Sequence, residues 1–350
     1  MRALTEAEGR VIAILLGGSG ASERERLRRI RVPRSTYHAA RRRAYQEGWL
    51  KDRYVPDPAR FGFPIASFVI VRPFVDRASE LVGAWGQATS NVLTWASQQV
   101  VIGVFFHPDE GKAAKGIDRL APPEWSRWRF VLHVDVRGPT VPVYFDYEGL
   151  WTHVAEVAGT ATYPNGLGGG VGTDAEAPPV TPHQRWASSE LVHRPFVAQA
   201  AGKEGHLVGP LGLPFSHQRV LRSGWVAHRV FLEPATVPPF RGRSADVLTL
   251  IMGDLKPGAR PELLFGTLTR ECRVFPFLYV TDGRKLLIGA MGRAVGGGNP
   301  NGEAEPRRPV MATLQESLQG IEVLSEPAAN FRPTVDHRYD RVFPKTTPGA

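Results

Sequence analysis

The sequence predicts an α+β protein: a winged helix-turn-helix followed by a ferredoxin-like βαββαβ sandwich, with this plan repeated twice. Three observations lead to this prediction. A basic N-terminal stretch has the pattern of three short helices followed by a strand. The segment after it alternates between strand-like and helix-like patterns in the order that a ferredoxin-like fold requires. The same order of elements then recurs in the second half of the 350-residue chain.

Positive charge is concentrated at the N-terminus. The chain carries a net charge of +9, and residues 1–60 contain 14 Lys and Arg against 7 Asp and Glu. Most of the excess therefore lies in one short stretch. Such a concentration indicates a polyanionic partner, of which nucleic acid is the commonest, whereas the alternative interpretation is an ordinary solvated helix surface.

The N-terminal helices are marked by their ends. Capping boxes at residues 5–8 and 22–25 predict helices over 6–16 and 22–31. The turn Val32-Pro33 precedes a third helix over 34–47, which Gly48 ends. Residues 49–55 are expected to form a strand or strand pair bearing a short basic wing. A tight turn before the third helix and a basic strand after it are typical of a winged helix-turn-helix.

The third helix is the expected reader of the DNA major groove. Tyr37, Ala40 and Ala44 stand at i, i+3 and i+7 and should face the first two helices. Arginine can bond guanine through two hydrogen bonds, and Ser, Thr and His can contact base edges or phosphates. The residues expected to read or position DNA are Arg34, Ser35, Thr36, His38, Arg41 (half inward), Arg42 and Arg43. Those expected to hold phosphates are Lys51 and Arg53 in the wing and Arg24 and Arg28 in the second helix.

The segment VPRSTYHAARRRAYQEGWL, residues 32–50, resembles the reader helix of Lrp/AsnC-type transcriptional regulators. Ser35-Thr36, Arg42-Arg43 and Gly48-Trp49-Leu50 occupy the places of that family's pattern, and residues 57–62 look like its connection to the next domain. The resemblance covers about residues 1–150. It implies a ferredoxin-like domain that forms dimers and larger assemblies and binds amino-acid effectors. The turn near residues 97–99 lacks the family's Gly and acidic residue, so the effector is left open.

The segment after the winged helix predicts one ferredoxin-like domain. Strands are expected over 66–71, 91–97, 100–106 and 129–136, where apolar and β-branched residues run together or alternate, and helices over 76–88 and 109–120.

An internal repeat extends this plan over the whole chain. Gly48-Trp49-Leu50 is echoed by Gly224-Trp225-Val226, and strands over 247–252, 273–280, 285–291 and 321–324 accompany helices over 261–271 and 310–319. A hairpin turn with Asp282-Gly283 at its centre is expected between the second and third of these strands. The two sheets are expected to pair within the chain as a pseudo-dimer. Pro214 stands ten residues before Gly224, which weakens the second reader helix. The expected domains are a winged helix (1–60), a ferredoxin-like domain (61–158), a Gly/Pro-rich linker (159–182), a degenerate winged helix (183–240), a second ferredoxin-like domain (241–330) and a tail (331–350).

Motifs for chemistry are weak. The single cysteine, Cys272, excludes an intramolecular disulfide and a cysteine-only zinc site, and a buried structural thiol is expected. The ten histidines show no metal-ligand spacing, and His133 is expected either in a pocket or as a satisfied core residue. The glycine-rich stretch 168–172 lacks the Lys-Ser/Thr of a phosphate loop. We therefore expect no cofactor, no metal and no enzymatic activity. No apolar run is long enough to span a membrane, and a cytoplasmic protein is expected.

The predicted function is sequence-specific binding of double-stranded DNA, as a transcriptional regulator that acts as a homodimer. One alternative is a replication, partition or architectural DNA-binding protein of a mobile element. The other is a sirohaem-decarboxylase-like enzyme, because those enzymes resemble Lrp/AsnC proteins and work as pairs of such subunits. A duplicated chain fits a fused pair of that kind, but the Arg41-Arg42-Arg43 run would then be unexplained.

Overall fold

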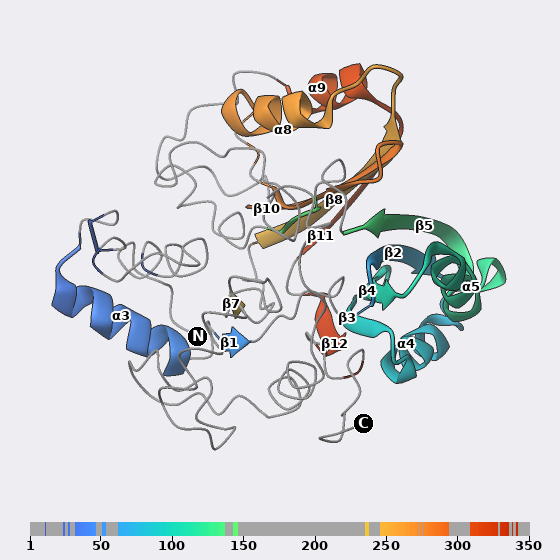
Figure 1. Cartoon of the computed structure of the whole chain (residues 1–350), viewed down its shortest axis with the longest axis horizontal. Coiled ribbons are helices and arrows are strands. Elements are labelled where there is room, and N and C mark those ends of the chain that lie inside the picture. The colour runs from blue at the N-terminus through green and yellow to red at the C-terminus, as the bar shows by residue number, and fades with distance from the viewer. Residues whose placement is uncertain are drawn as a thin grey trace.

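A computed structural model describes most of both ferredoxin-like domains and the third N-terminal helix (Figure 1). The residues it describes are 32–46, 51–53, 62–136, 143–145, 235–237, 246–272, 276–293, 309–327 and 330–335, with single positions at 11, 24, 27, 28, 274, 338 and 341. The helices expected over 6–16 and 22–31 lie outside this set except for four of those single positions. The expected linker (159–182), most of the second winged helix (183–234) and residues 294–308 also lie outside it.

The first half folds into the expected βαββαβ order. Its strands are β2 (Ile65–Pro73), β3 (Asn91–Ala96), β4 (Val101–His107) and β5 (Ser126–Asp135), and its helices are α4 (Ala78–Gln87) and α5 (Glu110–Leu120), with a 3-10 turn, η2 (Pro123–Trp125), before β5. The strands lie in the order β3-β4-β2-β5, all antiparallel. Nearly every residue of β2 and β4 is buried, because these central strands are covered on both faces.

The second half repeats the plan, as the sequence predicted. Its strands are β8 (Asp246–Leu255), β9 (Pro276–Thr281), β10 (Lys285–Arg293) and β11 (Leu318–Pro327), and its helices are α8 (Pro261–Arg270) and α9 (Val310–Ser317). The strand order β11-β8-β10-β9 matches the first sheet. Asp282 and Gly283 form the predicted hairpin turn, since Gly283 has φ of 85° and the Asp282 carboxylate accepts the backbone N–H of Lys285 at 2.7 Å.

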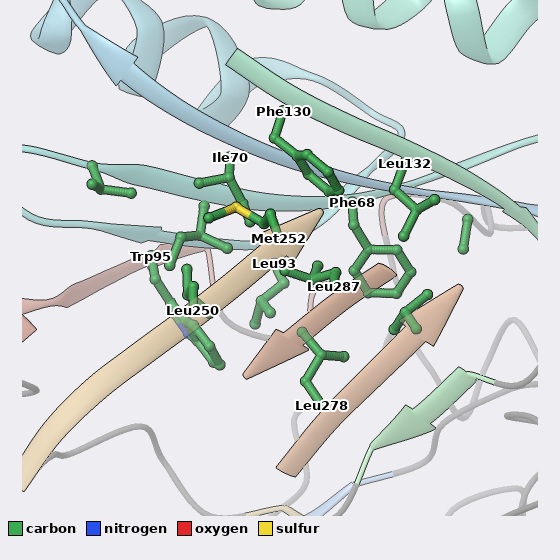
Figure 2. Packing of buried hydrophobic residues seen from close by; sticks show 14 of the residues in the cluster. Phe68, Ile70, Leu93, Trp95, Phe130, Leu132, Leu250, Met252, Leu278 and Leu287 are labelled. Carbon is green, nitrogen blue, oxygen red and sulfur yellow. The ribbon is translucent and has the colours of Figure 1, made fainter. Parts of the chain in front are cut away.

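The two sheets pack face to face and share one core, which confirms the expected internal pseudo-dimer. Figure 2 shows side chains of both sheets pointing into this core. Phe68 and Phe130 come from the first sheet, and Met252, Leu278 and Leu287 come from the second. The helices cover the outer faces: Leu81 and Trp85 of α4 pack on the first sheet, and Leu264 and Leu268 of α8 pack on the second. The result is a four-layer arrangement of helices, sheet, sheet and helices.

Each half also supplies a strand to the sheet of the other half, which the sequence did not predict. β6 (Val143–Phe145) follows the first domain but pairs with β9 of the second sheet. β12 (Arg332–Val335) follows the second domain but pairs with β3 of the first sheet. Both sheets therefore have five strands instead of the four expected of this fold. Residues 143–145, within the expected first domain, thus pair in the second sheet, and residues 332–335, within the expected tail, pair in the first.

A third pairing joins strands that lie within the two expected winged-helix segments. β1 (Lys51–Arg53) pairs antiparallel with β7 (Ala235–Val237), with Asp52 opposite Thr236. The strand expected over 49–55 is thus present at residues 51–53, and its partner comes from the other half of the chain.

Candidate nucleic-acid interface

The helix predicted to read DNA is α3 (Arg34–Gln46), close to its expected bounds. Pro33 fixes the turn before it, and its carbonyl accepts the first helical bond from the Tyr37 N–H at 3.0 Å. Tyr37 and Ala40 are buried, as their spacing predicted, and Val11 of the N-terminal segment is buried as well. One side of α3 therefore packs against the protein, and the opposite side faces solvent.

The exposed side of α3 carries a small residue near its centre and basic residues along its length. Ser35, Ala39, Arg42 and Gln46 stand at i, i+4, i+7 and i+11 and are all exposed, so they form one stripe. Arg34 and Arg43 are exposed on either side of this stripe. We call this set (Arg34, Ser35, Ala39, Arg42, Arg43 and Gln46) the basic face of α3. Ala39 and Gln46 were not among the predicted site residues, although the helical period alone places them there.

Three predicted reader residues lie at the border of this face. Thr36, His38 and Arg41 are only half exposed, so they flank the stripe instead of leading it. For Arg41 this agrees with the expected half-inward position. The Arg34 guanidinium lies 3.4 Å from His38 Nε2 across one helical turn, and the Tyr37 ring packs edge-on against His38. These contacts hold His38 beside the helix and away from the centre of the stripe.

The predicted phosphate-binding residues fall into two groups. Arg24 and Arg28, in the segment expected to be the second helix, are both exposed. Lys51 and Arg53 lie in β1, opposite Val237 and Ala235. The exposure of the first pair is consistent with phosphate contacts. For the second pair the placement changes from a free wing to the ribbon that joins the two halves, and their phosphate role stays a prediction.

Other candidate chemistry is limited in the described part of the chain. No group of three or more His, Cys, Asp or Glu residues there is arranged to hold a metal ion. Cys272 is buried, with its sulfur 3.4 Å from Thr313 Oγ1, which confirms the expected buried thiol. None of the described helices is long and apolar enough to cross a membrane.

Comparison with known proteins places the fold. No family model matches the chain, and no curated protein sequence does. Among solved structures the likeness shows the fold, two ferredoxin-like halves in one chain. One solved protein that the chain is similar to over nearly its whole length is the siroheme decarboxylase NirDL. In complex with an iron-uroporphyrin III analogue, that structure has a TM-score of 0.51 and 9% identity and covers 96% of both chains.

NirDL without the analogue gives a TM-score of 0.50 and 10% identity over 96% of this chain. Shorter structures match only part of the chain. AsnC of E. coli matches 38% of this chain and 93% of its own, at 11% identity and a TM-score of 0.30. A transcriptional regulator of Neisseria meningitidis in complex with L-Met matches 38% of this chain and 90% of its own, at 12% identity and a TM-score of 0.30.

Proposed function

We propose that this chain is a sequence-specific double-stranded DNA-binding protein, a transcriptional regulator, that reads the major groove with α3. The observation that carries the proposal is the basic face of α3, which opposes a buried side fixed by Tyr37 and Ala40. Arg34, Arg42 and Arg43 are exposed on this face of the helix. They supply the charge that phosphates and guanine edges recognise.

The shape of α3 fits this role. Its 13 residues extend about 20 Å, enough to follow the floor of a major groove about 12 Å wide. Ser35 and Ala39 are small and lie in the N-terminal half of the exposed stripe, so the helix backbone can approach the base edges closely. Arg42 then reaches bases from the centre of the stripe, while Arg34 and Arg43 reach the phosphates on its two sides.

The pairing of the two halves of the chain has a consequence for the symmetry of the DNA site that the protein would bind. A palindromic site needs two readers related by a two-fold axis. The β1–β7 ribbon pairs a strand from each expected winged-helix segment antiparallel, which is the arrangement that a two-fold axis between the halves produces. We expect either the second winged helix or a second copy of the chain in a homodimer to provide the other reader.

The test is a salt-titrated gel shift with DNA selected by the protein from a random or genomic pool. The double variant Arg42→Ala/Arg43→Ala should lose specific binding and keep its fold, because both side chains are exposed. If both arginines contact phosphates, the slope of the logarithm of the binding constant against the logarithm of salt concentration decreases in magnitude by about 1.8. This corresponds to about 60-fold weaker binding at 0.1 M salt. Lys115→Ala/Arg119→Ala, which removes two exposed cations from α5, is the matched control and should change little. Equal affinity of the wild type and the α3 variant would refute the assignment.

A second function is favoured by one observation, the likeness in fold to NirDL over the whole chain. It is a sirohaem-decarboxylase-like activity in which the duplicated chain acts as a fused pair. An absorbance titration with iron-uroporphyrin III separates the two proposals. A saturable shift of the Soret band without selective DNA capture supports the enzyme, whereas DNA capture without a shift supports the regulator.

A further inference from the structure

The exposed stripe of α3 places its residues at defined heights along the helix. With about 100° of turn and about 1.5 Å of rise per residue, one arc of about 60° holds Ser35, Ala39, Arg42 and Gln46. Ala39 and Arg42 are separated by about 4.5 Å along the helix axis. Successive base pairs of DNA rise by about 3.4 Å, so this separation is closer to one base-pair step than to two. Ala39 and Arg42 are therefore spaced to meet neighbouring base pairs.

Arg42 is the arginine of the basic face that is directed at the floor of the groove. Arg34 and Arg43 are turned about 80° and about 100° away from Arg42, in opposite directions around the helix. The major groove is bounded on its two sides by the phosphates of the two strands, so a cation on either flank of the helix faces a phosphate chain. A side chain at the centre of the stripe faces the base edges between them.

The Arg42 guanidinium is available to a ligand. It is exposed, and in the part of the chain that the structure describes its side chain takes part in no hydrogen bond or ion pair. The Arg34 guanidinium, in contrast, contacts His38 at 3.4 Å. A guanidinium presents parallel N–H donors in a rigid fork, which matches the O6 and N7 acceptors of guanine in the major groove. Among the four base pairs, G·C is thus the one that Arg42 suits best.

Ala39 presents a methyl group to the next base pair. It is exposed, and its direction is fixed because Tyr37 and Ala40 are buried on the other side of the helix. An alanine methyl packs against the C5 methyl of thymine, which projects into the major groove. It offers no donor or acceptor to the other base edges. A longer side chain at this position would hold the helix away from the bases and shorten the reach of Arg42.

We propose that α3 recognises a DNA half-site in which a G·C pair stands next to a T·A pair, with the Arg42 guanidinium bonding guanine O6 and N7 and the Ala39 methyl packing on the thymine methyl. The inference rests on the proposed DNA binding and names its target. Arg34 and Arg43 contact the phosphates on either side and add affinity without sequence preference.

The test begins with the full wild-type chain and a pool of random double-stranded DNA, from which the bound sequences are selected and read. We expect a motif that contains adjacent G·C and T·A pairs. In the selected duplex, 7-deazaguanine replaces the guanine and removes its N7 acceptor, which should weaken wild-type binding about tenfold. Uracil replaces the thymine and removes the methyl group, which should weaken binding about fourfold.

Three variants assign these effects to side chains. Arg42→Lys keeps the charge but not the fork, so it should bind the guanine and 7-deazaguanine duplexes alike. Ala39→Gly should bind the thymine and uracil duplexes alike. Arg43→Ala is the matched control, because it removes a neighbouring exposed arginine: it should weaken binding to every duplex and keep the preference for guanine. Far-UV circular dichroism establishes that each variant is folded.

The outcomes separate this inference from the proposed function. A wild-type chain that selects no DNA overturns both. Selected DNA without the adjacent G·C and T·A pairs overturns the base assignment alone, and so does equal wild-type binding to the guanine and 7-deazaguanine duplexes. A folded Arg42→Lys chain with the wild-type preference for guanine also overturns it, because Arg42 would then serve only as a charge near the phosphates. In these last three cases the proposed DNA binding still stands.

Discussion

Trp85 of α4 packs directly over Gly103 of β4, and this contact yields a prediction about stability. Trp85 is fully buried, and its indole N–H donates to the Leu120 carbonyl at 2.8 Å. A Cβ built on Gly103 would stand 2.6 Å from Trp85 Cζ3 and 2.7 Å from Phe105 Cε2. We therefore expect Gly103→Ala to destabilise the protein, because two rigid buried rings would have to move.

The second half shows how the same position is filled without a glycine. By strand register the counterpart of Gly103 is Ile288, and the counterpart of Trp85, at the eighth position of its helix, is Leu268. A small residue below a large one is thus exchanged for two residues of middle size. Overpacking costs about 1–3 kcal/mol, and the distances place Gly103→Ala near the upper end of that range. Trp85→Leu alone should cost about 2–4 kcal/mol through the cavity that it leaves.

Urea unfolding followed by far-UV circular dichroism measures these changes without relying on tryptophan fluorescence. In Gly103→Ala/Trp85→Leu the two costs should not add: we expect the double variant to be more stable than their sum by at least about 1 kcal/mol. Gly83→Ala on α4 is the control, because no atom lies within 4 Å of its added Cβ and alanine favours a helix. Wild-type stability of Gly103→Ala, or strict additivity in the double variant, would refute the packing argument.

Three further predictions concern pH, a turn and the tail. Burial lowers the pKa of His107 from near 6.5 in the unfolded chain to about 4 in the folded protein. The free energy of unfolding should therefore be highest above pH 6.5 and fall by up to about 3 kcal/mol as the pH drops toward 4. Urea unfolding at pH 7 and pH 4.5 measures this loss, and the His107→Asn variant should show a smaller dependence on pH. Gly283→Ala should cost about 1–2 kcal/mol in the same assay, because Gly283 has φ of 85° in the Asp282 turn. Deleting residues 330–350 removes β12 and exposes the edge of β3, and light scattering should then detect association of chains; a monodisperse monomer would contradict this expectation.

The elements that the sequence predicted are those with a repeated local pattern. β2 is an unbroken apolar run, α3 has an inward stripe at helical spacing, and the Asp282-Gly283 turn has one strongly preferred geometry. Each signal lies within a short window of sequence. The same reasoning placed Ser35 and Arg42 on the outward side of α3, and the structure has both exposed.

The features that the sequence did not predict depend on distant partners. β6 and β12 have only three and four residues, too few for a period to show, and each pairs with a strand of the other half. The placement of Lys51 and Arg53 in the β1–β7 ribbon follows from the same kind of long-range pairing. The contact between Ser67 and His133 was missed for a related reason. The two residues are 66 positions apart, and only the folded chain brings them together.

Divergence between the halves separates structural from functional change. Where Trp85 and Gly103 replace Leu268 and Ile288, one residue grows as its neighbour shrinks, so the exchange conserves volume and is explained by packing alone. The pair formed by Ser67 and His133 has no such compensation. Thr249 and Ser325 stand at the equivalent positions of the second half and bond each other through their hydroxyls. Burial lowers the pKa of His133, so this imidazole is a cost that the second half avoids, and the volume of its neighbours does not offset it.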